Sequence, residues 1–202
     1  QVEIVVYDTF SVFGGNVNGD FTVSNGTLSA SGNVSFDGGT IKLDGNFPTG
    51  TGNVALGDAA LDDGSLSGAA NTAIGSSALS ANTSANSNTA IGFAAMDVNT
   101  TGALNTAVGQ DALGANTTAS NGTAVGYQAL FVNTTGADNV AIGYQALDAN
   151  TTAANNTAVG STALGANTTG GSNVAVGKGA LDANTTGTTN IAIGVNALGA
   201  NT

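Results

Sequence analysis

Apolar and small residues recur at a fixed spacing of 17 positions through most of this chain. Aligning residues 53–202 on the glycine that follows an apolar residue gives nine copies of N-T-A-[VI]-G-x-x-A-L-x-[AV]-N-T-T-x-x-x, of which only the first is one residue longer. The aligned glycines are Gly57, Gly75, Gly92, Gly109, Gly126, Gly143, Gly160, Gly177 and Gly194. One copy is too short to enclose a core, so the period predicts a solenoid of stacked copies.

The three residues before each aligned glycine predict a short strand. The first is β-branched in all nine copies, the second is always Ala, and the third is Val or Ile in eight copies. β-Branched residues favour strands, and the glycine marks a turn or bend. Strands stacked in register form a parallel ladder that advances about 4.8 Å per coil, so nine coils predict a rod roughly 40 Å long.

The invariant alanine predicts that something packs closely against the strand. The β-branched positions face one way and the alanine the other. If the β-branched face fills the coil, the alanine face meets another chain. If the alanine faces inward, an apolar Val/Ile stripe stays outside and still needs a partner, so both alternatives predict an oligomer. The candidate interface column is Ala55, Ala73, Ala90, Ala107, Ala124, Ala141, Ala158, Ala175 and Ala192.

The second half of each copy predicts a core residue and a corner. Two variable positions follow the glycine, and then come Ala and Leu, replaced once by Met96. This segment fits either a single helical turn or a second strand, and its Leu is expected to fill the coil. Asn stands seven positions past the glycine in eight copies. Asn tolerates a left-handed backbone and stacks in ladders, so it predicts a recurring corner rather than a glycosylation site.

Residues 1–52 follow a different pattern, in which short period-two strands alternate with Gly and Asn turns. We therefore expect two parts, a β-rich shaft or connector over 1–52 and a β-roll repeat array over 53–202. The fold class is all-β, a parallel β-roll solenoid of nine 17-residue coils, each with either a helical turn or a second strand after its glycine.

Composition excludes most catalytic and binding chemistry. The chain has no His, Cys or Arg, so neither a Ser-His nor a Cys-His nucleophile pair can form. A net charge of −11 with only two lysines argues against nucleic acid and anionic membrane surfaces as partners, and no apolar stretch is long enough for a membrane span. We expect no enzymatic activity and no cofactor.

Carboxylates are the remaining candidates for chemistry. Four of them share the column five positions past the glycine but never occupy neighbouring copies, an arrangement that avoids repulsion rather than sharing a proton. These are Asp62, Asp97, Asp148 and Asp182. In the first copy, Asp58, Asp62 and Asp63 read either as a cation site or as a solvated charged cap, and we favour the cap, with no metal.

Aromatic residues at the variable positions are candidates for receptor contact. Tyr127 and Tyr144 share a column in neighbouring copies, Phe93 lies in the same column, and Phe131 lies close to Tyr127 in sequence. Exposed aromatic rings suit sugar faces, and simple coverage of the outer surface is the competing interpretation. Ice binding is a further alternative, although the two adjacent Thr positions would point to opposite faces of a strand.

The repeats resemble a known family. "NTAIG", "NVAIG" and "NTAVG" followed by "ALxAN" are similar to the head repeats of YadA-like trimeric adhesins and to repeats of bacteriophage tail-fibre proteins. The leader "GTLSASGNVSFDGGTIKLDGN" resembles tail-fibre shaft sequence. The resemblance implies a homotrimer of left-handed parallel β-rolls on a fibre shaft. Its location would be extracellular, on a virion or a bacterial surface. Its partners would be a cell-surface glycan or receptor and other virion or appendage proteins.

One departure from the family concerns the repeat length, because the adhesin head repeat is shorter than 17 residues. The extra residues would form a larger loop or the helical turn. The sequence as a whole predicts a structural fibre protein that acts as a rigid trimeric spacer. The alternatives are a glycan-binding adhesin and an ice-binding solenoid.

Overall fold

Nine short strands, one from each repeat, build the part of the chain that the structure describes. The computed structural model describes residues 51–63 and 65–200, so nearly all of the expected shaft segment 1–52 lies outside the described residues. Each strand has three residues and ends just before its aligned glycine. The strands are β1 (Val54–Leu56), β2 (Thr72–Ile74), β3 (Thr89–Ile91), β4 (Thr106–Val108), β5 (Thr123–Val125), β6 (Val140–Ile142), β7 (Thr157–Val159), β8 (Val174–Val176) and β9 (Ile191–Ile193).

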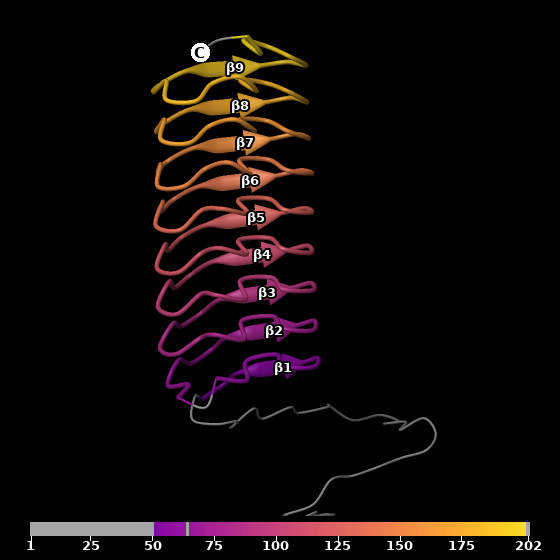
Figure 1. Ribbon diagram of the computed structural model, residues 1–202, viewed down its shortest axis with the longest axis vertical. Coiled ribbons are helices and arrows are strands. Elements are labelled where there is room, and N and C mark those ends of the chain that lie inside the picture. Colours follow the sequence, from indigo (N-terminus) through magenta and orange to yellow (C-terminus); the bar gives the residue numbers. More distant parts are fainter. Residues whose placement is uncertain (1–50, 64, 201–202) are drawn as a thin grey trace, which may run out of the picture. The chain divides into compact units, whose positions relative to one another are not determined.

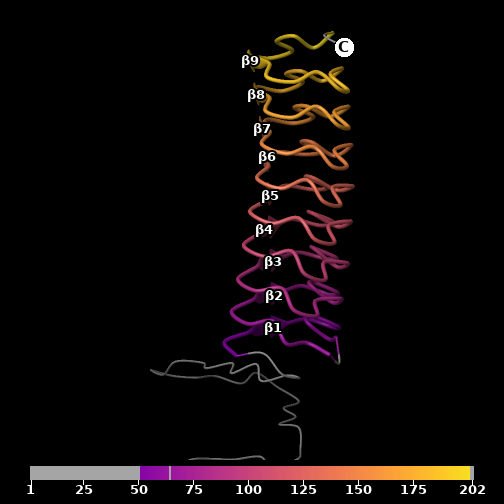
Figure 2. The same ribbon diagram turned by 90° about the vertical axis from the view of Figure 1, so that its left-hand side faces the viewer.

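The strands form one parallel sheet in chain order, and equivalent residues of neighbouring repeats are paired, as in Ala107↔Ala124. Figure 1 shows the coils stacked one above another, and Figure 2 shows that the sheet forms one wall of the stack while turns and loops close the other side. The predicted all-β solenoid of parallel coils is confirmed. Within the described part of the chain, no helix is long and apolar enough to cross a membrane.

Small side chains fill the interior of each coil. From β2 to β9 the alanine in the middle of each strand is buried, at 0–3% exposure, and faces the Ala and Leu of the following turn. Leu113, Leu130 and Leu147 are typical of these core leucines, each at most 1% exposed. The expectation that the leucine fills the coil is confirmed. A 17-residue coil encloses a narrow space, and one leucine and two alanine methyls occupy it.

The alanine column is therefore not an interface between chains. The predicted contact with another chain is wrong for the buried members of the column, and it stays a prediction for Ala55. The buried members lie inside their own coils and are Ala73, Ala90, Ala107, Ala124, Ala141, Ala158, Ala175 and Ala192. Ala55, in the first coil, is exposed, and Ala192 is 3% exposed. The steric limit that keeps this position small comes from the leucine across the coil.

The segment after each glycine is neither a helical turn nor a second strand. Its second and fourth residues have left-handed backbone, as at Gln128 (φ 54°) and Leu130 (φ 54°). The Gln128 N–H donates to Gln110 O in the preceding coil, and the Leu130 N–H donates to Ala146 O in the following coil. Because alternate N–H groups bond to the coils on either side, the pattern of bonds along a helix does not form.

Two columns of asparagine close the interior at its corners. The predicted column is buried at 0–1% exposure from Asn82 to Asn184, and its side-chain N–H groups donate to the carbonyl three residues ahead, as from Asn133 to Gly136 O (3.0 Å). A second column stands immediately before the strands. The side-chain oxygens of this column accept hydrogen bonds from the backbone N–H of the equivalent residue in the next coil. The Asn156 N–H, for example, donates to Asn139 Oδ1, and the same bond forms in six other copies, with N–O distances of 2.7–2.9 Å.

Candidate interaction surfaces

The outer face of the sheet is an extended apolar surface that runs along the described coils. We define the sheet face as the first and third residues of β1 to β9, which point outward because the alanine between them points inward. The third position holds Val, Ile or Leu throughout, and several of these side chains are exposed, including Ile91 (37%), Ile142 (40%) and Val176 (36%). The first position holds Thr, Val or Ile.

No charged residue belongs to the sheet face, because all 18 of its positions are Thr or aliphatic. Nine rows about 4.8 Å apart and about 10 Å wide give a face of roughly 400 Å². The largest apolar patch of a soluble monomer is typically about 300–600 Å² and is often functional. Of the two arrangements that the sequence left open, the structure has the one with alanine inside and the aliphatic stripe outside.

Tyr127 and Tyr144 form the second surface. Their rings lie nearly parallel, with centroids 5.5 Å apart and planes 13° from each other, so the shared column brings the two rings into a stack. Both side chains are exposed, at 40% and 52%. Beside them, Gln145 Nε2 donates to Gln128 Oε1 at 3.0 Å. The repeated dipeptide Tyr-Gln therefore builds a two-coil patch of paired rings and paired amides.

The two phenylalanines lie apart from this pair. Phe93 shares the tyrosine column but stands two coils before Tyr127, with Gln110 in the coil between, and it is 57% exposed. Phe131 belongs to the column five positions past the glycine. A Cβ placed on Gly114 would lie 3.1 Å from two Phe131 ring carbons, so this ring packs over the glycine of the coil before.

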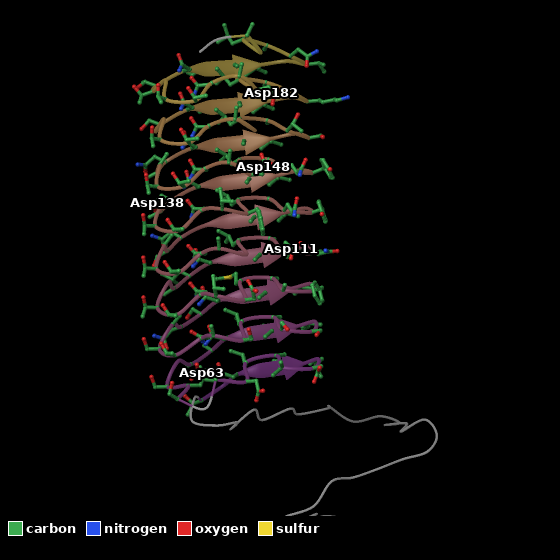
Figure 3. All side chains as sticks on the ribbon, viewed as in Figure 1. Asp63, Asp111, Asp138, Asp148 and Asp182 are labelled. Carbon is green, nitrogen blue, oxygen red and sulfur yellow. The ribbon has the colours of Figure 1, made fainter. Side chains whose placement is uncertain are left out.

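The carboxylates do not converge on one site. Figure 3 shows Asp138 at one edge of the stack, apart from Asp111, Asp148 and Asp182. Partial burial raises the pKa of Asp148, and repulsion from Asp182 adds to this rise. Burial likewise raises the pKa of Asp97. Over residues 51–63 and 65–200, no three acidic side chains come together as metal ligands.

At the entry to the array, Asp63 is a partly exposed carboxylate with a local partner. Its Oδ1 accepts hydrogen bonds from the Ser65 backbone N–H (2.7 Å) and from the Ser65 hydroxyl. These bonds favour the charged form and hold the pKa of Asp63 below its usual value. Such a carboxylate fits the solvated cap that the sequence favours.

Sequence reasoning missed two features of these surfaces. The asparagine column before the strands was visible in the consensus, but an Asn before a strand also reads as a turn residue. Gln128 and Gln145 stand at a variable position, where only their recurrence beside the two tyrosines gives a signal. Comparisons of the chain with family models, curated proteins and solved structures found no match.

Proposed function

We propose that this chain is a structural fibre protein whose coils associate as a homotrimer through the sheet face and act as a rigid extracellular spacer. The observation that carries the proposal is the charge-free aliphatic stripe along all nine strands. A single chain leaves this stripe in water, whereas packing against other copies removes it at about 25 cal/mol per Å² of apolar surface. The family resemblance of the repeats favours three chains over two.

Hydrogen bonds along the stacking axis support a mechanical role. Thr134 Oγ1 donates to Thr151 O at 3.1 Å, and six such threonine bonds join successive coils from Thr83 to Thr185. The strand ladder and the asparagine columns add further bonds in the same direction. Stretching or bending the stack would break several of these bonds at each junction, so the repeat resists both.

The oligomer is tested by the mass in solution. We expect light scattering of the full chain at micromolar concentration to give three times the mass of one chain. Val108→Lys with Val125→Lys places two charges on the sheet face and should yield monomers. The matched control is Thr101→Lys with Thr118→Lys, because both threonines are exposed in loops away from the strands. A stable wild-type monomer would contradict the proposal.

Ice binding is the second candidate, and one observation favours it. On the sheet face, a column that contains five threonines runs beside a column of Val, Ile and Leu. Such a regular array suits ice binding, whereas the paired threonines in the loops do not form one. A trimer buries this array and a monomer presents it to water. Thermal hysteresis in a monomeric wild type, lost in the Val108→Lys and Val125→Lys variant, would favour ice binding over the fibre.

A further inference from the structure

The stacked tyrosines offer one ring face to a ligand. The two rings are stacked on each other, so the outer face of Tyr127 lies on the side of the coil that carries Gln110 and the outer face of Tyr144 on the side of the coil that carries Ser161. Tyr144 is the more exposed of the two, at 52% against 40%. The neighbour on the Tyr144 side, Ser161, is also smaller than Gln110 on the Tyr127 side. The free face of Tyr144 is therefore the open platform.

The space above Tyr144 is bounded by small and polar residues. The Thr162 N–H donates to Tyr144 O (2.9 Å) and the Gly179 N–H to Ser161 O (3.0 Å), which fixes the next two coils directly above the ring. Ser161 and Gly179 are small, and the exposed Lys178 stands two coils above Tyr144. With about 4.8 Å per coil, roughly 10 Å separates the ring from the Lys178 position.

A pyranose ring fits this spacing. Its carbon atoms would contact the tyrosine ring at about 4 Å, which leaves room for the sugar below the lysine. Its hydroxyl groups would meet hydroxyls of Ser161 and Thr162 and the side-chain oxygen of Gln145, whose Nε2 is already bonded to Gln128. A ring with one apolar face and polar edges matches an aromatic platform with polar groups around it.

Charge decides between neutral and acidic sugars. Residues 53–202 contain eight aspartates and a single lysine, so the array repels polyanions. Asp148 and Asp182 occupy the coils that carry Tyr144 and Lys178. Lys178 can donate to sugar hydroxyls, but one cation does not outweigh this field for an acidic polysaccharide.

We propose that Tyr144, with Gln145, Ser161, Thr162 and Lys178, forms a binding site for one uncharged pyranose ring of a polysaccharide. This inference deepens the adhesive alternative for the fibre and does not require the trimer. In a trimer the same site would occur three times per fibre, so a weak contact with each ring would add up on a repetitive glycan.

Saturation-transfer NMR on the full chain tests the site. The probes are methyl β-glucoside, methyl β-galactoside and chitobiose, with glucuronic acid as the acidic comparison. We expect at least one neutral probe to receive saturation on the protons of one ring face, with a dissociation constant near about 1 mM. Tyr144→Ser should weaken this binding at least tenfold, and glucuronic acid should bind more weakly than the neutral probes.

The serine variant keeps the repeat intact, because Ser76 and Ser161 occupy the same column naturally. Phe93→Ser is the matched control, since it removes an exposed ring from this column outside the proposed site and should leave binding unchanged. Binding by no neutral probe, or equal binding in Tyr144→Ser, would overturn the inference. Light scattering on the same samples reports the trimer separately, so loss of sugar binding with an unchanged mass rejects only this site.

Discussion

At the scale of single residues, two separate structural requirements call for glycine at the aligned positions, namely an unusual φ angle and close contact with the next coil. Their φ angles lie between 125° and 140°, a region that residues with a side chain rarely adopt. In addition, a Cβ on Gly126 would lie 2.4 Å from the carbonyl oxygen of Gly143 in the next coil. Gly194 shares the unusual φ, but a Cβ there would meet only Ala197 Cβ, at 3.8 Å. Comparing substitutions at Gly126 and Gly194 therefore separates the effect of backbone strain from the effect of contact with the next coil.

We predict that Gly126→Ala destabilises the array far more than Gly194→Ala does. The Gly194 variant should cost about 1–3 kcal/mol for backbone strain alone. The Gly126 variant adds a clash with backbone that cannot move without separating two coils, and we expect a total above about 3 kcal/mol. Urea unfolding followed by circular dichroism measures both. Equal losses would show that φ alone requires the glycine.

The asparagine column before the strands has a single gap among the described copies. Gly122 stands where the other copies hold Asn, and its N–H donates to Asn105 Oδ1 at 2.7 Å. Having no side chain, it gives no acceptor to the N–H of Asn139 in the next coil. Its φ is not left-handed, and a Cβ there would lie 3.0 Å from Asn105 Oδ1. The other copies accommodate Asn in the same register.

Gly122→Asn should therefore stabilise the protein. The new amide would accept the Asn139 N–H and donate to Gly136 O, as the equivalent amides do in the other copies. The Gly136 carbonyl already accepts Asn133 Nδ2 and Asn139 Nδ2, and the new amide would replace the second of these. The net gain is one hydrogen bond, about 0.5–1.5 kcal/mol, and the loss of glycine adds a smaller gain through the unfolded chain. Gly122→Ala is the control that changes the backbone without adding the amide. If the urea midpoint of Gly122→Asn is no higher than that of Gly122→Ala, the hydrogen bonds of this asparagine column do not stabilise the array.

At the scale of one coil, the sequence predicted the strand, the core leucine and the corner asparagine, because each occupies an almost invariant column. It did not predict which strand face is internal. The alternation of side chains along a strand defines two faces, but it does not show which of them faces the narrow interior opposite Leu130. It also did not predict the left-handed residues at Gln128 and Leu130. Gln, Ala and Leu prefer helix, and bonds to the coils on both sides override that preference. The tyrosine stack followed from the period, whereas its free face depends on the size of Ser161.

The partly buried carboxylate of Asp148 makes the stability of its coil depend on pH. Because burial raises the pKa of Asp148, the folded protein binds the carboxyl proton more tightly than the unfolded chain does. The resulting contribution to folding stability is complete below the pKa of the unfolded chain and is lost as pH rises through the raised pKa of the folded protein. We expect Asp148→Asn to gain stability over the wild type between pH 3 and pH 7, by no more than about 0.5 kcal/mol because solvent screens the group. Thermal unfolding across this range measures the difference.

Asp63→Asn is the control with the opposite sign. The Ser65 bonds lower the pKa of Asp63, so their contribution is present above the unfolded value and is lost as pH falls. This variant should therefore be less stable than the wild type at pH 7, and the gap should close toward pH 3. If both variants follow the same trend, burial is not the cause of the Asp148 effect.

At the scale of the whole molecule, each coil contacts only its neighbours, since the sheet runs in order from β1 to β9. Copy number then sets length, and a whole coil should be removable. Deleting residues 161–177 joins Gly160 to Lys178 and keeps every column in phase. Deleting residues 161–178 instead leaves a 16-residue coil, in which Leu181 shifts one position and Asp182 takes the core leucine position.

We predict that the 17-residue deletion folds with a stability within about 1 kcal/mol of the wild type and shortens the particle by about 4.8 Å. The 18-residue deletion should lose several kcal/mol, because it buries a carboxylate in a coil interior that is lined by apolar side chains and asparagine amides. Urea unfolding measures the stability of the two deletion variants, and small-angle scattering measures their length. Equal stability would mean that the coils tolerate a slip in register, and the repeat would then not set the length of the fibre.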